Sequence, residues 1–390
     1  MEIIVLANTV LVKGGISGGD IVLPYINKYW GGRFKIKVMT TTQGRRVWES
    51  IGSNAEFILL PHMKYEEREL KFTFLFTYII RTIFAALKLS KMLHGRKEGN
   101  IVLSASDFFP DVLPACLLKG KGNFWVARVY HLIKSPSERK GNPLLNILSF
   151  LLQRASLAMI RAKADLILTP IGTYKELCAL GFDKERIFIN NPGVDLQKID
   201  SVRPSDRHYD AIFIGALLHN KGSYDIVNIW NEVTKKIRDA KLVVIGGGPK
   251  KEVEDFKKMI EERGLGSHIE YLGFVRDIED VYTRLKSSRV LILTGHENGW
   301  SIPVSEAFAC GIPVVAYNLK MFGTAFKRGF ISVPLYDTGK FAEEIINLLE
   351  DDKLRAELSK EAYSEGRGLG WDKVSQGLGI RLEAYSIERG

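Results

Sequence analysis

The chain has 390 residues, of which 46% are hydrophobic and 26% are charged. This balance excludes a disordered chain, and the length exceeds one ordinary hydrophobic core, so two α/β domains are expected. The formal net charge of +10 favours anionic partners such as phosphates or anionic lipid headgroups. Since no RNA-binding signature and no basic arm is present, nucleic acid is not an expected partner.

Three cysteines, Cys116, Cys178 and Cys310, lie far apart and show no metal-ligand spacing, which predicts a reducing cytoplasmic location. Residues 1–10 have the pattern of a buried strand and lack the regions of a signal peptide. We expect no membrane span, because about 20 mainly apolar residues are required. Residues 72–87 come nearest, and Arg81 interrupts them.

In the first half of the chain, apolar runs typical of strands alternate with helical segments, as in parallel βαβ units. The predicted strands are 3–6, 36–40, 55–60, 101–104, 124–129, 166–169 and 187–189, and the predicted helices include one after Gly19, one over 72–93 and one over 144–161.

The helix predicted over 72–93 is apolar on nearly all sides. A narrow polar stripe interrupts it at helical spacing, and cations follow at its end; the residues are Thr73, Thr77, Arg81 and Lys88, then Lys91, Arg96 and Lys97. One interpretation is a long core helix with cations at its negative end. The alternative is an apolar, basic-edged surface that contacts anionic membrane, which would place the protein peripherally on the cytoplasmic membrane face.

A turn-rich polar stretch over 191–206 is the predicted interdomain linker. Beyond it the alternation restarts. The predicted strands are 211–215, 242–245, 269–271, 290–293 and 314–316, and the predicted helices are 224–237, 251–263, 303–309, 341–350 and 372–388. The expected fold is therefore two Rossmann-like, doubly wound parallel sheets with a ligand cleft: domains 1–200 and 201–370, and a terminal helix, 371–390, that packs back toward the first domain.

Three constellations carry candidate chemistry. The first is the loop over 14–20, in which Gly14 and Gly15 let backbone amides approach an anion at the start of a helix. The alternative is a flexible surface turn. The second is the segment over 212–222, where Lys221 begins a helix after the strand that ends at Gly215. A lysine there opposes the helix dipole unless it binds an anion such as a diphosphate, although a solvated lysine is the alternative.

The third constellation is Glu306, which falls in the first turns of a helix that opens near Pro303. Its neighbours are apolar, so its carboxylate needs a partner, and paired ribose hydroxyls would supply one. A glutamate that only interacts with the helix dipole is the alternative interpretation.

Residues 298–307, with the sequence NGWSIPVSEA, resemble the E-G-F-G-L-P-x-x-E-A signature of glycosyltransferase family 4. Other family-like pieces stand in the family's order at the N-terminal glycine loop and at 191–195, 215–222, 244–249 and 271–275. The resemblance implies the GT-B fold and a retaining glycosyltransferase. It implies a nucleotide-diphosphate sugar as donor, bound mainly by the second domain, and a glycan or lipid-linked acceptor, bound mainly by the first.

The resemblance also implies residue roles. Lys221 would bind the diphosphate, Glu306 the ribose, and His131, which follows a strand, the transferred sugar. The backbone near the signature and the loops around the cleft would complete the site; these residues are Gly14, Gly15, Gly215, Phe274, Val275, Gly299, Trp300, Ser301 and Ile302. No Asp-x-Asp motif is evident, so neither a metal nor another cofactor is expected, and the leaving phosphate would act as base for front-face attack by the acceptor.

Two positions depart from the family pattern. Asn298 stands where the family has its first glutamate, although Glu297 precedes it, and Ala216 stands where an arginine is usual. An asparagine still hydrogen-bonds a sugar hydroxyl, and His219 or Arg276 would replace the missing cation. These departures keep two alternatives open: a catalytically weak or silent nucleotide-sugar or glycan-binding protein, and a nucleotide-sugar epimerase.

Overall fold

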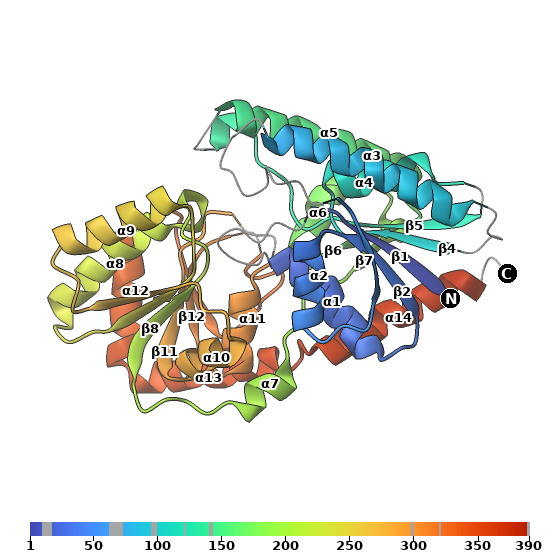
Figure 1. Ribbon diagram of the computed structural model, residues 1–390. Coiled ribbons are helices and arrows are strands. Elements are labelled where there is room, and N and C mark those ends of the chain that lie inside the picture. The colour runs from blue at the N-terminus through green and yellow to red at the C-terminus, as the bar shows by residue number, and fades with distance from the viewer. Residues whose placement is uncertain are drawn as a thin grey trace. The chain divides into compact units, whose positions relative to one another are not determined.

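The computed structural model describes residues 1–9, 18–61, 73–94, 100–120, 122–139, 143–297, 300–319 and 321–387. Two compact units divide the chain. The first comprises the described residues up to Asn191 and those from Asp372, and the second comprises 192–371. Each has a single parallel sheet, as expected from the alternating pattern (Figure 1).

The sheet of the first unit has seven parallel strands in the order β3-β2-β1-β4-β5-β6-β7. The chain runs outward from β1 and returns to β4, so the switch point of this doubly wound sheet lies between them. Its strands are β1 (Glu2–Ala7), β2 (Lys35–Thr40), β3 (Glu56–Leu59), β4 (Asn100–Ser104), β5 (Asn123–Arg128), β6 (Leu166–Thr169) and β7 (Ile187–Ile189).

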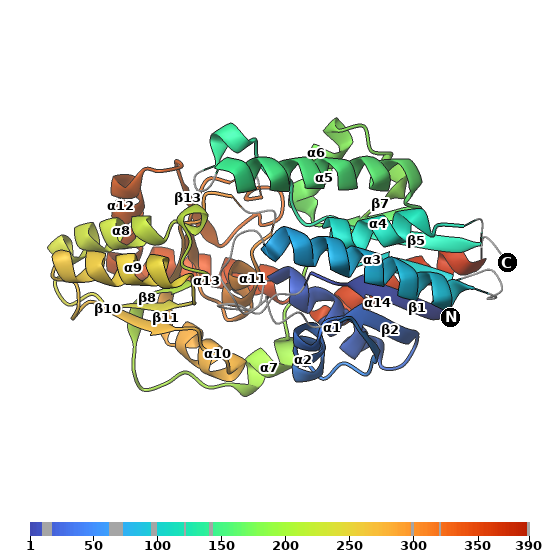
Figure 2. The same cartoon turned by 45° about the horizontal axis from the view of Figure 1, so that its top comes forward.

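Helices cover both faces of this sheet (Figures 1 and 2). One face carries α3 (Thr73–Leu93), α4 (Phe109–Leu117) and α5 (Pro143–Lys163), and the other carries α1 (Gly18–Trp30), α2 (Thr42–Ser50) and α14 (Trp371–Ile387); α6 (Ile171–Ala179) joins β6 to β7. Alternation along β1 explains the two layers, since Ile4 and Leu6 pack under α3–α5 while Ile3 and Val5 face the opposite way.

The C-terminal helix α14 is held to α1 and to the turn that follows it by specific contacts. The Trp30 indole donates a hydrogen bond of 2.8 Å to the Ser375 carbonyl oxygen. The Arg33 guanidinium forms a bidentate pair with Glu383 at 2.7 and 2.5 Å. The end of the chain therefore belongs to the first unit, although about 180 residues of the second unit precede it.

The sheet of the second unit has six parallel strands in the order β10-β9-β8-β11-β12-β13. Its elements are α7 (Leu196–Ser201), β8 (Tyr209–Ile214), α8 (Ser223–Lys236), β9 (Leu242–Ile245), α9 (Lys250–Glu262), β10 (Ile269–Gly273), α10 (Ile278–Lys286), β11 (Ser288–Leu293), α11 (Ile302–Ala309), β12 (Val314–Tyr317), β13 (Phe330–Val333), α12 (Thr338–Glu350) and α13 (Asp352–Gly366). The switch point lies between β8 and β11, so the loops after these strands are neighbours.

The predicted strands are confirmed, with ends that shift by one or two residues. The edge strand β13 was not predicted, because it has only four residues, of which Val333 alone is buried, and it lacks a long apolar run. The linker is not wholly irregular: α7 forms within it, and the Asp195 side chain caps this helix by accepting a hydrogen bond from the Lys198 amide at 3.1 Å.

One prediction about apolar helices was wrong. Among the described residues, the helix whose length and composition would allow it to cross a membrane is α5, not the segment over 72–87. Both interpretations of α3 remain predictions: Lys91 lies in its last turn, as the core-helix interpretation expects, and its outer side exposes apolar side chains, including Phe76 and Leu87.

Candidate functional site

The loops after β8 and β9 each contain one position where the backbone permits only glycine. Gly222 has a φ of 69°, and a Cβ atom on it would lie 2.0 Å from the Thr294 carbonyl oxygen. A Cβ atom on Gly246, which follows β9, would lie 1.7 Å from the Gly215 carbonyl oxygen. The loops after β8, β9 and β11 therefore pack backbone against backbone at the carboxyl edge of the sheet.

Lys221 lies at the end of the short 3₁₀ turn His219–Lys221, directly before α8. The Thr294 hydroxyl, which follows β11, donates to the carbonyl oxygens of Lys221 and Gly222 at 3.1 and 3.0 Å. Burial lowers the pKa of the Lys221 ammonium, and the nearby charge of Glu297 opposes this effect. Glu297 is itself held by the Asn220 amide at 2.9 Å. A cation withdrawn from water in this way interacts strongly with an anion that enters the site.

A hydrogen-bonded cluster behind Lys221 was not predicted from the sequence. The carboxylate of Asp225, in the first turn of α8, lies 2.8 Å from His296 Nε2 and accepts a hydrogen bond from the Tyr317 hydroxyl at 3.0 Å. The His296 ring packs edge-on against Tyr336, with centroids 4.6 Å apart. Since α8, the loop after β11 and the end of β12 meet here, the cluster fixes the loop that leads into 298–301.

Helix α11 presents an uncapped N-terminus at the same edge of the sheet. Ser301 is its N-cap residue, and within the described residues the Ser301 side chain makes no capping hydrogen bond. The Ser305 hydroxyl, one turn further along α11, donates to the Ser301 carbonyl oxygen at 3.2 Å. The first amides of such a helix form a ready anion site, and Ile302 provides one of them.

Glu306 lies on α11, and its side chain is 7% exposed. The Tyr282 hydroxyl of α10 donates to its carboxylate at 3.0 Å. Burial raises the pKa of Glu306 to about 7, and the Tyr282 hydrogen bond opposes this rise. Neither interpretation of Glu306, as a ribose ligand or as a glutamate that interacts with the helix dipole, included this hydrogen bond from a tyrosine of another helix.

The remaining predicted residues of the second unit lie around these loops. Phe274 follows β10 and is exposed, whereas Val275 packs on the hydrophobic core. Trp300 stacks near Phe326 with centroids 4.8 Å apart, and its buried indole N–H has no hydrogen-bond partner in the described part of the chain. Ala216 is exposed in the loop after β8.

In the first unit, His131 follows β5 and is exposed at the carboxyl edge of that sheet. Its backbone is fixed by Gln153 of α5, a residue that the sequence did not single out. The Gln153 amide donates to the His131 carbonyl oxygen at 2.9 Å and to the Asp107 carboxylate at 2.6 Å, and its oxygen accepts from the Ile133 amide at 2.7 Å. Burial raises the pKa of Asp107, opposed by Gln153 and by the charge of His131.

Four predicted site residues, Gly14, Gly15, Asn298 and Gly299, lie outside the described residues. Of the others, the structure brings Lys221, Gly215 and the start of α11 to one edge of the second sheet, while His131 lies at the corresponding edge of the first. Among described residues, no group of three or more histidine, cysteine, aspartate or glutamate side chains is placed to hold a metal ion.

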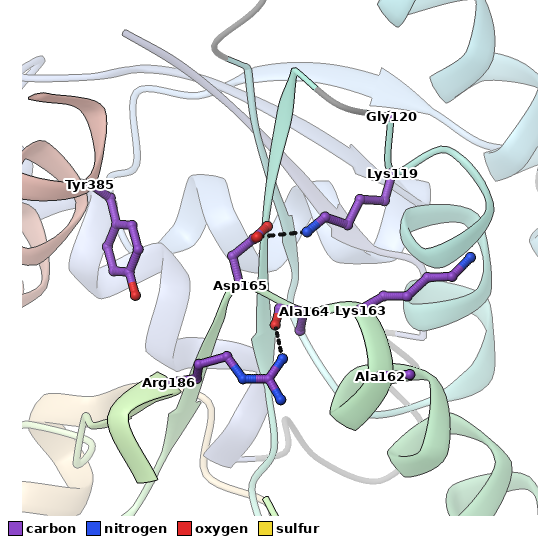
Figure 3. A pocket seen from close by; sticks show the side chains of 8 residues that line it. All are labelled: Lys119, Gly120, Ala162, Lys163, Ala164, Asp165, Arg186 and Tyr385. Atoms are coloured by element: carbon purple, nitrogen blue, oxygen red, sulfur yellow. Dashed lines mark hydrogen bonds and ion pairs between the residues drawn. The ribbon is translucent and has the colours of Figure 1, made fainter. Parts of the chain in front are cut away.

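A pocket of about 560 Å³ lies at the opposite edge of the first sheet, where strands begin (Figure 3). Lys119, Lys163 and Arg186 line it together with Asp165, which pairs with Lys119 at 2.6 Å. None of the predicted site residues lines this pocket. It is therefore separate from the candidate site.

The second unit is similar in sequence to a class of known enzymes. Residues 197–365 match the family model described as "Glycosyl transferases group 1". The match covers most of the second unit, including Lys221, Glu297 and Glu306.

Particular relatives are distant. The chain is 27% identical over 164 residues to the poly(glycerol-phosphate) alpha-glucosyltransferase of Bacillus subtilis, covering 41% of this chain and 23% of the relative. It is 25% identical over 232 residues to the D-inositol 3-phosphate glycosyltransferase of Paenarthrobacter aurescens, covering 56% and 55%. The chain thus spans about a quarter to a half of the length of these two curated relatives.

Solved structures share the fold over the whole chain. Sucrose-phosphate synthase of Thermosynechococcus elongatus matches with a TM-score of 0.79 at 14% identity and full coverage of both chains. HepE of Anabaena, in complex with UDP and glucose, matches with a TM-score of 0.75 at 14% identity, covering 98% of this chain and 100% of HepE. The expectation of two Rossmann-like parallel-sheet domains is confirmed.

Proposed function

We propose that this protein is a retaining glycosyltransferase of family 4, which transfers a sugar from a nucleotide-diphosphate donor to a hydroxyl acceptor on a glycan or a lipid-linked saccharide. The observation that carries the proposal is the half-buried Lys221 at the carboxyl edge of the second sheet, within the segment that matches group 1 glycosyl transferases. The glycosyltransferases among the relatives and the complex of HepE with UDP and glucose support it.

The proposed chemistry follows from charge. Cleavage of the sugar–phosphate bond places negative charge on the departing diphosphate, and Lys221 together with the first amides of α11 would stabilise it. A charge-assisted hydrogen bond of this kind contributes about 1.5–3 kcal/mol. The acceptor hydroxyl would attack from the same face, with its proton passing to the leaving phosphate, so that the anomeric configuration is retained.

The other residues have supporting roles in this proposal. Glu306 would bind the ribose once Tyr282 has oriented its carboxylate, and Glu297, held beside Lys221 by Asn220, would supply the carboxylate that Asn298 lacks. His131 of the first unit would contact the transferred sugar. No metal or other cofactor is required in this scheme, because the cation and the helix amides neutralise the diphosphate.

The test is turnover of UDP- and GDP-sugars. Slow hydrolysis of one donor without acceptor, and transfer to glycan or lipid-linked acceptors, are the expected results, and EDTA should leave the rate unchanged. Nuclear magnetic resonance of the product reports its anomeric configuration, and an inverted product would contradict the retaining mechanism. The absence of both hydrolysis and transfer with every nucleotide sugar would refute the proposed activity.

One observation favours a second candidate function, a nucleotide-sugar-binding protein with little or no turnover. Ala216 is exposed where the family places an arginine, so the loop after β8 presents one cation fewer to a diphosphate. Such a protein would shift its unfolding temperature with UDP or GDP without hydrolysing their sugars. Hydrolysis that depends on Lys221 would exclude this candidate.

A further inference from the structure

Helix α3 is inverted relative to an ordinary surface helix. The polar residues Thr77, Arg81 and Thr82 face inward and are buried. The Arg81 guanidinium donates to the Asn8 carbonyl oxygen at 3.0 Å, and the Lys88 ammonium donates to the Leu59 carbonyl oxygen. These contacts reach the ends of β1 and β3, so the fold itself holds the polar side of α3 inward and its apolar side outward.

Helix α5 shows the same inversion. Its buried face includes Asn146, Gln153 and Ser156 beside Leu157 and Ile160. Gln153 forms the three hydrogen bonds that fix Asp107 and the segment after β5. In the most apolar stretch of α5, 18 residues long, only 28% of the residues are buried, whereas the core helix of a soluble protein is mostly buried.

The outward side chains of these helices form one apolar surface. Helix α4 lies between α3 and α5 and contacts both, and all three cover the same face of the first sheet (Figures 1 and 2). Of the 16 large hydrophobic residues that are exposed in the described chain, ten lie on or beside these helices: Phe76, Ile79, Ile83, Phe84, Leu87, Phe108, Leu117, Leu144, Ile147 and Leu151. Such a concentration marks an interaction surface, which we call the α3–α5 face.

Cations border the α3–α5 face. Neither α3 nor α5 contains an aspartate or a glutamate, whereas Lys91, Arg154 and Lys163 are exposed on them. Both helices precede strands of one parallel sheet, so their C-terminal ends lie at the same edge. The pocket of Figure 3 lies at this edge, where three cations surround the single carboxylate of Asp165.

We propose that the α3–α5 face docks on a lipid bilayer that carries anionic headgroups, with the apolar side chains in the acyl boundary and the bordering cations at the phosphates. Charge selects this partner over a second copy of the chain. In a two-fold contact through this face, α3 and α5 of the second copy would offer no carboxylate to these cations. An anionic bilayer instead meets both features, the broad apolar area and the cationic border.

The docking proposal is tested by co-sedimentation of the full chain with phosphatidylcholine vesicles, with and without phosphatidylglycerol, at low and high salt. We expect binding to the anionic vesicles that weakens with salt. The variant Ile83→Asn/Leu151→Asn should bind at least about tenfold more weakly, because two side chains that insert in the bilayer become polar. The matched control is Ile380→Asn on α14, since Ile380 is 55% exposed and Ile83 is 52% exposed. This control should bind within about twofold of the wild type.

A second variant tests the cationic border separately. Lys91→Gln/Lys163→Gln should lose roughly fivefold in affinity for anionic vesicles for each lysine and should reduce the salt dependence, since each cation near an anionic surface contributes modestly. Both altered side chains are exposed, so this variant also serves if the apolar one unfolds.

Three results would overturn the docking proposal. The first is the absence of co-sedimentation with anionic vesicles at low salt, and the second is equal binding by the wild type and both double variants. The third is a lipid-free dimer, seen by sedimentation velocity, that Ile83→Asn/Leu151→Asn dissociates; a second copy would then be the partner. Hydrolysis of nucleotide sugars is measured without lipid, so failure of the proposed function and failure of membrane docking are distinguishable.

Discussion

Replacing Glu306 with glutamine should stabilise the protein at alkaline pH and leave it unchanged in acid. The folded-state pKa of Glu306 is raised from 4.5 to about 7 by burial. Between these values the folded protein holds a proton that the unfolded chain releases, so stability falls as pH rises through this window. Above about pH 7 the buried carboxylate therefore costs up to about 3 kcal/mol. Glutamine keeps the size of the side chain and an oxygen for the Tyr282 hydroxyl, and it carries no charge.

The assay is thermal unfolding of the wild type and Glu306→Gln across the pH range. A gain of about 3 kcal/mol corresponds to roughly 6–12 °C for a domain of this size. We expect a gain of this order near pH 8 that disappears below about pH 4.5, where both states of the wild type are protonated. Glu252→Gln is the matched control, because the half-buried Glu252 also accepts a tyrosine hydrogen bond, from Tyr224 at 2.6 Å. Its effect should stay within about 0.5 kcal/mol at every pH.

A variant Glu306→Gln that is destabilised near pH 8, or stabilised equally at acid and alkaline pH, would refute this reasoning. The first result would mean that the carboxylate is stabilised by an interaction stronger than its desolvation. The same variant also tests the proposed ribose contact. It should weaken binding of uridine or guanosine as well as of their diphosphates, and unchanged nucleoside affinity would contradict that role.

Three further predictions concern the two sheet edges. Lys221→Ala should weaken binding of a nucleoside diphosphate roughly ten- to hundredfold with little effect on the nucleoside, measured by calorimetry, because one charge-assisted contact is lost; equal losses for both ligands would contradict the diphosphate role. Gly222→Ala should destabilise the protein by about 2–4 kcal/mol, because the new Cβ atom would meet Thr294. The control Gly264→Ala, where φ is 66° and the surrounding space is open, should cost only about 1 kcal/mol. Similar melting temperatures of the two variants would show that the loop at Gly222 relaxes. Gln153→Leu should cost about 2–4 kcal/mol and speed amide exchange at 131–133, because buried Asp107 and two partly buried backbone groups lose their hydrogen bonds. Unchanged exchange would refute this positioning role.

The order of strands and helices could be predicted from the sequence because buried parallel strands are short apolar runs, and the glycine-rich loops between them need particular backbone conformations. The same local signals predicted Lys221 as a candidate ligand of a diphosphate, whereas the backbone at the start of α11 was named only because of the family resemblance. Each of these signals lies within about ten residues of the feature it predicts.

The orientation of α3 and α5 was decided only by the tertiary structure. Helical spacing defines a polar stripe, but it does not say whether that stripe faces water or the protein. For α3 the answer depends on the Asn8 carbonyl oxygen, 73 residues from Arg81 in sequence. Likewise, Glu306 pairs with Tyr282, and Asp225 pairs with His296 and Tyr317, all of which lie on other elements. The local sequence does not determine which way a polar side chain points. Its direction is set when the fold brings a distant donor or acceptor to it, because a buried polar group with a hydrogen-bond partner is much more stable than one without.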